Sequence, residues 1–395
     1  MNSRIRFAIA LVLAVSLFFT TTNLIPLSLL FSLFSVFLLL LFSTSLIFQK
    51  TIPSYVFSLL LFYLIVLTSL FAYDPEALMR PLFYRYDGSF LICFLPVLVT
   101  PLIPSLPIKS EKLLVVFSGF ASIISFVGIL YNKQFGFFSA TNAFGGFLMA
   151  PLAISLSWFF YTPSRRSFLL FSALLAELFI STSRGSILGF ALSAIAYSAT
   201  LVNNKFFKQI PIFIVILLTS SQLILLSGSY PNYLIYRDNL SYALESGATT
   251  KEANNIKRVY ENWPRAMFAF LSSPIVGAGY GSVNDVPHDF EQSASLIKFN
   301  KGPHSYNDSH AHNVYFNILA ELGLLGLVIF LYFLSSLFTF IQQVIPNGVP
   351  RAATSIMLYS LIFSSFTENR LTAPSNIIPF VLVFVISSKG VQARR

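Results

Sequence analysis

Long runs of apolar residues are the feature that most constrains how this chain can fold. A membrane-spanning helix needs about 20 consecutive apolar residues, and twelve segments of the chain approach or exceed that length. They are residues 7–22, 24–48, 54–72, 89–106, 113–131, 140–161, 167–182, 186–202, 209–227, 313–342, 352–366 and 374–388. We therefore predict an all-α integral membrane protein with about twelve transmembrane helices.

The overall composition supports this class. Of 395 residues, 55% are hydrophobic and 10% are charged, whereas a soluble domain usually carries about 25% charged residues. The net charge of +10 would suggest a nucleic-acid partner in a soluble protein, but a membrane protein needs basic residues in its cytoplasmic loops. We therefore expect the lipid bilayer, and no nucleic acid, as a partner. The single cysteine, Cys93, excludes a disulfide framework within the chain.

The distribution of Lys and Arg predicts the orientation in the membrane. If the N-terminus is cytoplasmic and the spans alternate, the cytoplasmic segments hold thirteen basic residues and one acidic residue. The short outer loops then hold only five basic residues. This asymmetry follows the positive-inside rule and places both termini in the cytoplasm. It divides the chain into transmembrane helices 1–9 (residues 1–227), a large outer loop (228–312) and transmembrane helices 10–12 (313–395).

The large outer loop is expected to carry function, because loops of this length without a role are uncommon. Within it, residues 251–271 have apolar side chains at a period of about 3.6 residues, which predicts an amphipathic helix that Pro264 kinks. Arg258 and Arg265 are seven residues apart, so they project from nearly the same side of that helix. Together they could bind a phosphate group bidentately. The alternative is a solvated face on which they pair with Glu261.

Arg184 lies at the outer end of the seventh span, in the sequence Ser183-Arg184-Gly185-Ser186. We expect Gly185 to allow a tight turn and Ser186 to cap the next helix. The N–H groups at the start of a helix favour an anion, and an arginine beside them adds donors that suit a phosphate group. The alternative is an interfacial anchor whose side chain reaches the lipid headgroups.

Two histidines, His310 and His312, come directly before the tenth span. An imidazole exchanges a proton near neutral pH, so either side chain could accept the proton of a hydroxyl group. The rival interpretations are a metal site and a structural pair of histidines at the membrane interface. The spacing of His, Asp and Glu matches no metal signature, and residues two apart point away from each other on a helix. We therefore expect no metal.

Further polar residues are candidates. Glu321 lies in the tenth span, where a carboxylate at membrane depth is a functional candidate by default, although it could instead cap backbone groups at a break in the helix. Glu177 in the seventh span is similar, and we expect it to be structural. Arg85 and Asp87, in an outer loop, could contact sugar hydroxyls or phosphate, or form an interfacial salt bridge. The glycine-rich run at 274–281 follows no strand and has no nucleotide-binding lysine, so it predicts a turn.

These pieces together resemble the O-antigen ligase / O-antigen polymerase superfamily of multi-pass glycosyltransferases. Residues 183–185 resemble the family's arginine after its central span, and residues 258–279 resemble its arginine-bearing loop helix with a proline–glycine turn. Residues 310–326 resemble its His-Asn…Glu-x-Gly-x-x-Gly block, and residues 142–146 resemble an Asn-Ala-Phe segment that opens a span. The order of the pieces and their common outer face make the resemblance more specific than any one of them.

The resemblance implies both an architecture and a chemistry. The spans of such enzymes surround a groove open to lipid, as in GT-C-like glycosyltransferases, and the donor is a glycan on undecaprenyl pyrophosphate at the periplasmic face of the bacterial inner (plasma) membrane. By the resemblance, Arg184 and Arg258 hold the pyrophosphate, with Arg265 as a secondary contact. His312 deprotonates or orients the acceptor hydroxyl for attack with inversion, and His310 is next for that role. The resemblance implies no metal and no other cofactor.

Within the superfamily, the resemblance leaves three reactions open. We expect first an O-antigen ligase that transfers the glycan to lipid A–core, then an O-antigen polymerase, and then a protein O-oligosaccharyltransferase. A secondary transporter is the alternative from another class, because twelve spans with both ends inside is a common transporter layout. Two observations argue against it: the long loop is predicted outside, between the ninth and tenth spans, and the polar residues gather at the outer face and not at the midplane.

Overall fold

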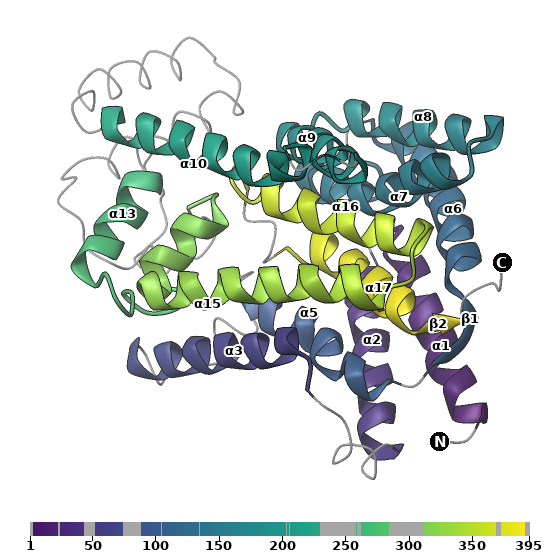
Figure 1. Cartoon of the computed structure of the whole chain (residues 1–395), viewed down its shortest axis with the longest axis horizontal. Helices are drawn as coiled ribbons and strands as arrows, with labels where there is room; N and C mark the ends of the chain where they lie inside the picture. Colours follow the sequence, from purple (N-terminus) through teal and green to yellow (C-terminus); the bar gives the residue numbers. More distant parts are fainter. Residues whose placement is uncertain are drawn as a thin grey trace.

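Figure 1 shows a computed structural model of the chain. It describes residues 3–22, 24–42, 52–73, 88–103, 105–133, 135–202, 204, 206–229, 258, 262–283, 311–368 and 373–391. The candidates Arg85, Asp87 and His310 lie outside these residues, as does Glu261, the alternative partner of the loop arginines.

Helices make up nearly all of the described structure. The first half contains α1 (Ser3–Phe19), α2 (Ile25–Phe42), α3 (Ser54–Tyr73), α5 (Gly88–Val99), η1 (Thr100–Leu102), β1 (Leu106–Lys109), α6 (Ser110–Tyr131), α7 (Thr141–Tyr161), α8 (Arg165–Ile180) and α9 (Arg184–Leu201). The second half contains η2 (Phe207–Gln209), α10 (Ile210–Ser229), α13 (Trp263–Ser272), α15 (Val314–Val344), α16 (Val349–Ser364), α17 (Pro374–Lys389) and β2 (Gly390–Val391). Each predicted span coincides with one α-helix, and α13 comes from the large loop.

The length and composition of the helices are those of a multi-pass membrane protein. Among the described residues, four helices are long and apolar enough to cross a membrane: Ser110–Tyr131, Thr141–Tyr161, Phe207–Leu226 and Val314–Val344. Four shorter apolar helices accompany them: Ile25–Leu38, Ser54–Ser69, Leu91–Leu102 and Pro374–Lys389. An all-α membrane fold is therefore confirmed, while the crossing of the membrane by all twelve segments stays a prediction.

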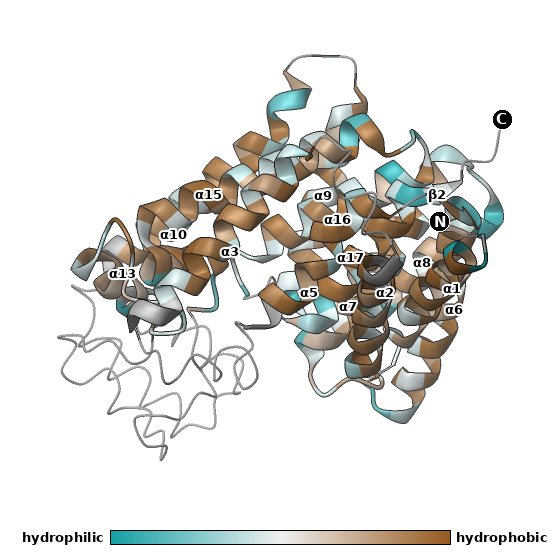
Figure 2. Ribbon diagram, turned by 90° about the horizontal axis from the view of Figure 1, so that it is seen from below, coloured by the Kyte–Doolittle hydropathy of each residue, from teal (hydrophilic) through white to brown (hydrophobic). Residues whose placement is uncertain are grey.

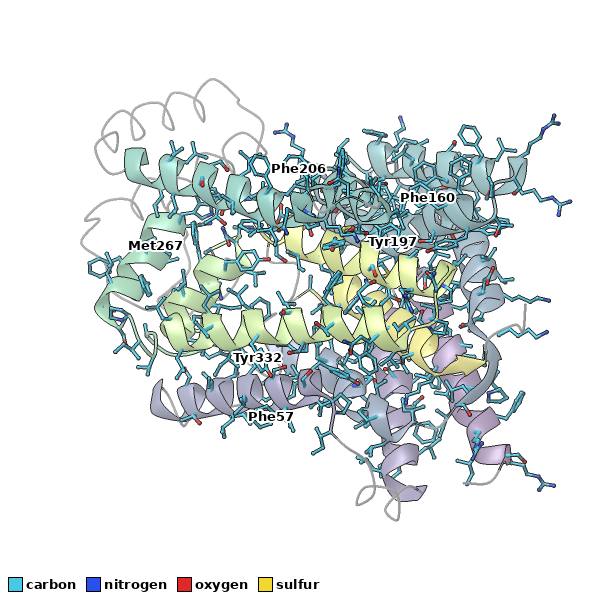
Figure 3. The ribbon with its side chains drawn as sticks, viewed as in Figure 1. Phe57, Phe160, Tyr197, Phe206, Met267 and Tyr332 are labelled. Atoms are coloured by element: carbon cyan, nitrogen blue, oxygen red, sulfur yellow. The ribbon has the colours of Figure 1, made fainter. Side chains whose placement is uncertain are left out.

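Large apolar side chains cover the outside of the molecule. The ribbon is predominantly hydrophobic along most helices (Figure 2). Phe57, Phe206 and Tyr332 are exposed and are labelled among the side chains in Figure 3. Side chains of this kind suit contact with lipid tails, and a soluble protein would leave few of them in water.

The centre of the bundle is formed by α7, α16 and α17, which are buried along most of their length. Small residues allow these helices to approach their neighbours closely, as is common between helices in membranes. A Cβ atom at Gly189 of α9 would lie 2.7 Å from Cβ of Ser364 in α16. One turn away, the hydroxyl groups of Ser193 and Ser360 are hydrogen-bonded at 2.7 Å.

The end of the bundle that is predicted to be cytoplasmic is closed by local contacts. Strands β1 and β2 pair in parallel, so the segment before α6 lies beside the segment after α17. The Tyr161 hydroxyl, at the end of α7, donates to Oδ1 of Asn347 at 3.0 Å. These two short strands are an addition to the all-helical fold that the sequence predicts.

A turn from the large loop closes on a break in α15. Gly323 has φ 64° and ψ −165°, which interrupts the helix. The 274–279 turn enters there: the N–H groups of Ala278 and Gly279 donate to the carbonyls of Ala320 and Glu321 at 2.8 and 3.0 Å. In return, the N–H groups of residues 324 and 325 donate to the carbonyls of residues 274 and 275 at 2.9 and 3.1 Å. We call this set of four hydrogen bonds the clasp.

The clasp fixes α13 against α15. Trp263 and Ala266 of α13 pack in one buried cluster with Phe316 and Ala320 of α15, and the rings of Trp263 and Phe316 meet edge to face at 5.6 Å. In the described structure α13 begins at Trp263, and Pro264 lies in its first turn. Proline is well tolerated there, since the first N–H groups of a helix have no partner within the helix. Residues 259–261, just before this helix, lie outside the described residues, so the kink at Pro264 stays a prediction.

Candidate functional site

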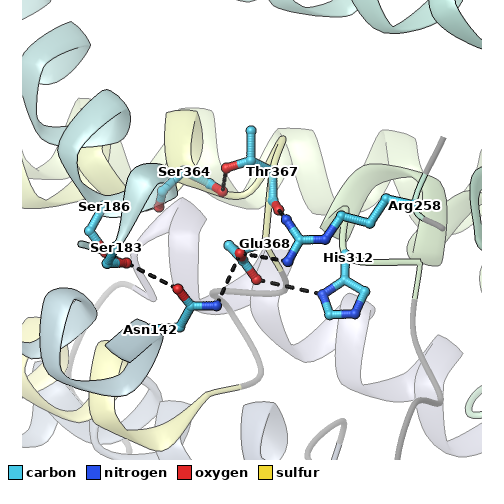
Figure 4. Close-up of polar contacts among 8 residues, drawn as sticks. All are labelled: Asn142, Ser183, Ser186, Arg258, His312, Ser364, Thr367 and Glu368. Atoms are coloured by element: carbon cyan, nitrogen blue, oxygen red, sulfur yellow. Dashed lines mark hydrogen bonds and ion pairs between the residues drawn. The ribbon is translucent and has the colours of Figure 1, made fainter. Parts of the chain in front are cut away.

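Three polar side chains contact the carboxylate of Glu368, which follows α16, and a fourth joins them through Asn142 (Figure 4). Its Oε1 accepts hydrogen bonds from Arg258 Nη2 at 2.9 Å and from Asn142 Nδ2 at 3.1 Å. Its Oε2 lies 3.6 Å from Nδ1 of His312. The Ser183 hydroxyl donates to Oδ1 of Asn142 at 3.1 Å. We call these five residues the Glu368 cluster.

The 365–368 turn that carries Glu368 is held by three other parts of the fold. Its first three carbonyl groups each accept a hydrogen bond from a different element. The carbonyl of Ser365 accepts from the N–H of Val314 in α15 at 3.0 Å. The carbonyl of Phe366 accepts from Nε2 of Gln222 in α10. The carbonyl of Thr367 accepts from Nη1 of Arg258 in the large loop at 2.8 Å. Because the three donors come from three different elements, the turn that carries the Glu368 carboxylate is held from several sides.

His312 is held in an unusual backbone conformation directly before α15. Its φ of 50° lies in the left-handed region, which few residues other than glycine occupy. Asn313 caps the helix, since its Oδ1 accepts from the N–H groups two and three residues on, at 2.9 and 3.2 Å. The N–H of Ala311 donates to Oδ1 of Asn317 at 3.1 Å. Strain of this kind persists where the surroundings fix it, and it tends to occur at functional sites.

Arg258 reaches the cluster from the large loop and is largely buried, with 17% of its side chain exposed. Two of its N–H groups bind the 365–368 turn, one at the carbonyl of Thr367 and one at the carboxylate of Glu368. A guanidinium group has five N–H donors. Because two of them already bind the turn, the plane of the Arg258 guanidinium is fixed. A fixed plane suits the other N–H groups to bidentate recognition of an anion.

Asn142 and Ser183 join the cluster from the N-terminal ends of α7 and α9. These two helix ends touch, because a Cβ atom at Gly145 would lie 2.4 Å from Cβ of Ser183. The hydroxyl groups of Ser183 and Ser186 are hydrogen-bonded at 2.9 Å. Thr182, the residue before this pair, has a φ of 54°. Thr182 and His312 are the two non-glycine residues with positive φ in the described structure, and each comes just before a helix of the site.

Arg184 is the first residue of α9 and its side chain is exposed. The helix begins two residues earlier than the sequence predicted, with Ser183 as the N-cap residue, so the expected cap at Ser186 is wrong. The reason is that Ser186 is used inside the first turn, where its hydroxyl bonds that of Ser183. Ser183, the residue before Arg184, donates to Asn142, and Asn142 donates to Glu368. Glu368 in turn binds Arg258.

The electrostatics of this region favour an anion. The N-terminal ends of α7, α9 and α15 meet at the cluster, and each helix start carries a partial positive charge. The guanidinium groups of Arg184 and Arg258 add two full positive charges, which the single carboxylate of Glu368 only partly offsets.

The other candidates from the sequence lie elsewhere in the described structure. Arg265 is on α13 and is half-buried. Glu321 is fully buried at the clasp, where its carbonyl accepts from Gly279. Glu177 is also buried, and its Oε1 accepts from the Ser122 hydroxyl at 2.8 Å, which ties α8 to α6.

Glu368 lies at the centre of the site, but it was not among the candidate residues predicted from the sequence. A signal was present, since Glu368 is the only acidic residue after Glu321 in the chain. It also follows the eleventh predicted span on the outer face, where Arg184, Arg258 and His312 are predicted to lie. In the described structure Arg258 pairs with Glu368, and the alternative pairing with Glu261 lies outside the described residues.

The described residues contain no group of three or more His, Cys, Asp or Glu side chains that could hold a metal ion. His312 and Glu368 are the two such side chains in the cluster. Because Glu368 also binds Arg258 and Asn142, its carboxylate is used for hydrogen bonds.

Comparison with known protein families gives one match. Residues 168–331 match the family model described as O-antigen ligase. The matched segment contains Arg184, Arg258 and His312, whereas Asn142 and Glu368 lie outside it. The comparison with curated proteins found no match.

Proposed function

We propose that this chain is an O-antigen ligase of the O-antigen ligase / O-antigen polymerase superfamily, because residues 168–331 match the family model described as O-antigen ligase. It transfers a glycan from undecaprenyl pyrophosphate to a hydroxyl group of lipid A–core, at the periplasmic face of the bacterial inner membrane. The observation that carries this proposal is the Glu368 cluster, which brings an imidazole and a fixed guanidinium together at three helix N-termini.

His312 acts as the general base. Its Nδ1 faces the Glu368 carboxylate at 3.6 Å, so we assign proton transfer from the acceptor to Nε2. In the reaction, Nε2 takes the proton of the acceptor hydroxyl while that oxygen attacks the anomeric carbon of the donor sugar. The bond from the anomeric carbon to the pyrophosphate oxygen breaks, and the configuration inverts. His310 is the second candidate for this role.

Arg184 and Arg258 bind the leaving group. As the glycosidic bond breaks, negative charge grows on the pyrophosphate oxygen, and fixed positive groups aimed at it lower the barrier. Arg258 is held by the 365–368 turn, and Arg184 stands at the start of α9, whose N–H groups add to its attraction. Arg265 on α13 serves as a secondary contact. This chemistry needs no metal ion, because the protein supplies the positive charge.

The proposed orientation agrees with the parity of the helices. The cluster takes residues from the starts of α7, α9 and α15, from the end of α16 and from the large loop. If the N-terminus is cytoplasmic and all twelve segments cross, every one of these positions lies on the outer face. The paired strands β1 and β2 then lie on the cytoplasmic face, where the Lys- and Arg-rich segments are predicted.

The test is a transfer assay with purified protein, an undecaprenyl-pyrophosphate-linked glycan, and lipid A–core either present or absent. A chelator is included, and products are separated by gel and identified by mass spectrometry. We expect transfer to lipid A–core in the presence of the chelator, and a loss of at least about a thousandfold in rate for His312→Ala. Arg166→Ala, an exposed arginine at the predicted cytoplasmic end, is the control and should keep the wild-type rate.

Other products would point to other functions. Lengthening of the lipid-linked glycan without lipid A–core would show a polymerase. Transfer only when a protein acceptor is added would show a protein O-oligosaccharyltransferase. If His312→Ala lost uptake of a solute but kept glycan transfer, the protein would be a secondary transporter and not a glycosyltransferase.

A further inference from the structure

We propose that Glu368 is the positioning residue of this site: one carboxylate fixes both the imidazole of His312 and the guanidinium of Arg258. The proposal rests on the proposed function, because it assigns a role within the same transfer reaction. It concerns a residue outside the segment that matches the O-antigen ligase family.

The first step of the argument is that the carboxylate itself cannot move freely. The carbonyls of the 365–368 turn are bound by α15, α10 and Arg258, and the N–H of Glu368 donates to the Ser364 carbonyl at 3.0 Å. Only 12% of the Glu368 side chain is exposed. A carboxylate on so constrained a turn can set the orientation of its neighbours.

The second step concerns the imidazole. A carboxylate only accepts hydrogen bonds, so the nitrogen that faces it carries the proton and the other nitrogen carries the lone pair. With Nδ1 of His312 facing Oε2 of Glu368, the lone pair is on Nε2, which is the form a general base requires. The 3.6 Å separation is longer than a hydrogen bond, and a shift of about half an ångström would close it, as happens in catalytic pairs when they engage substrate.

The third step concerns the guanidinium. Oε1 of Glu368 and the Thr367 carbonyl bind two different nitrogens of Arg258, which fixes the plane of the group as well as its position. Asn142 donates to the same Oε1 and keeps that oxygen in place from the side of α7. The two oxygens of the Glu368 carboxylate therefore contact His312 and Arg258 separately. This arrangement fixes the distance between the imidazole and the guanidinium.

The test compares Glu368→Gln with Glu368→Asp. Gln keeps the size of the side chain, but its NH₂ group in place of Oε2 would donate to Nδ1 and leave the proton on Nε2. We expect kcat to fall about 10- to 100-fold, as is typical when the partner of a functional histidine is removed. The KM for the lipid-linked donor should rise a fewfold, because Arg258 loses its ionic partner. Asp keeps the charge and should recover at least about threefold in kcat over Gln.

The matched control is Glu177→Gln, which removes another buried carboxylate of the membrane region, one whose side-chain partner Ser122 is outside the cluster. Glu177 binds the Ser122 hydroxyl between α8 and α6, so its substitution should leave kcat and KM within about twofold of wild type. Thermal unfolding of each purified variant is followed in parallel. If a variant only contained less folded protein, its apparent kcat would fall without a change in KM. The midpoint of its thermal unfolding would fall as well.

The outcomes separate this inference from the proposed function. If the wild-type protein transfers no glycan to any acceptor, the proposed function fails and this inference fails with it. If the wild type transfers and His312→Ala does not, but Glu368→Gln retains the wild-type kcat and KM, the inference alone is wrong. An equal loss for Gln and Asp with an unchanged KM would also overturn it, since that result describes a residue needed only for folding.

Discussion

The two ends of the segment 311–326 are held in different ways. At its start, His312 faces a carboxylate and Asn313 caps α15 with its side chain. At its end, residues on both sides of the break at Gly323 bind the 274–279 turn through main-chain groups, in the four hydrogen bonds of the clasp. Side-chain chemistry therefore determines the first end, and the shape of the backbone determines the second.

The large loop connects the two ends of this segment. The large loop contributes Arg258 to the first end and the 274–279 turn to the second. The clasp anchors the loop to the tenth helix, and the anchored loop holds Arg258 within reach of Glu368. We therefore expect substitutions at the clasp to reduce the amount of folded protein, and substitutions at the Glu368 cluster to reduce the rate per folded molecule.

The largest effect is expected from Gly277→Ala at the clasp. Gly277 has a φ of 77°, and a Cβ atom there would lie 2.2 Å from the backbone carbon of Glu321. The left-handed backbone and the forced shift of α15 should together cost at least about 3 kcal/mol. We expect a large drop in the thermal unfolding midpoint and in the yield of monodisperse protein in detergent.

Gly119→Ala is the control for this prediction. Gly119 lies within α6, and a Cβ atom there would have no heavy atom within 4 Å. Alanine favours a helix over glycine by up to about 1 kcal/mol, so this variant should be as stable as wild type or slightly more so. A Gly277→Ala protein with the wild-type midpoint would show that the clasp does not hold the loop.

The clasp also shows how much of the fold was readable from the sequence. The apolar runs located every helix of the bundle, because a membrane span must be long, apolar and helical throughout. A break inside an apolar helix leaves no such mark. The sequence predicted a turn at 274–281, and a break in the helix near Glu321 was one alternative for that residue. Only the fold shows that the turn and the break bind each other.

The site was partly readable for a similar reason. His312 and Arg258 stand out because charged and titratable groups are rare in this chain, and they do meet in space. Glu368 was missed because its role depends on a contact between residues 110 positions apart, which no local pattern records. Asn142 was noticed as the start of a span, but its hydrogen bond to Glu368 crosses 226 positions.

Arg258→Lys should give the next largest effect, and it acts on the first end alone. Lysine keeps the positive charge, but its single nitrogen cannot hold the Thr367 carbonyl and the Glu368 carboxylate in the fixed geometry of a guanidinium. We expect kcat/KM for the lipid-linked donor to fall about a hundredfold, with a thermal midpoint close to that of wild type. Steady-state kinetics at varied donor concentration measure the effect.

Arg351→Lys tests whether that loss is specific to the site. Arg351 also donates to a main-chain carbonyl, that of Ile345 at 2.7 Å, but at the opposite end of the bundle. Its substitution should leave kcat/KM within about twofold of wild type. Equal losses for the two lysine variants would mean that fixed arginines matter only for packing, and the distinction between the ends would disappear.

The smallest effect is expected at Asn142, the residue that joins α7 to the cluster. Asn142→Ala removes one hydrogen bond to the Glu368 carboxylate and one from Ser183, which should reduce the transfer rate about tenfold. Asn142→Asp has nearly the same size but places a second negative charge about 3 Å from Oε1 of Glu368, where it would compete for Arg258. We therefore expect the Asp variant to lose more activity than the Ala variant, although it conserves the shape. The reverse order would show that Asn142 only fills space between α7 and α9, and that Glu368 is oriented by the 365–368 turn without help from α7.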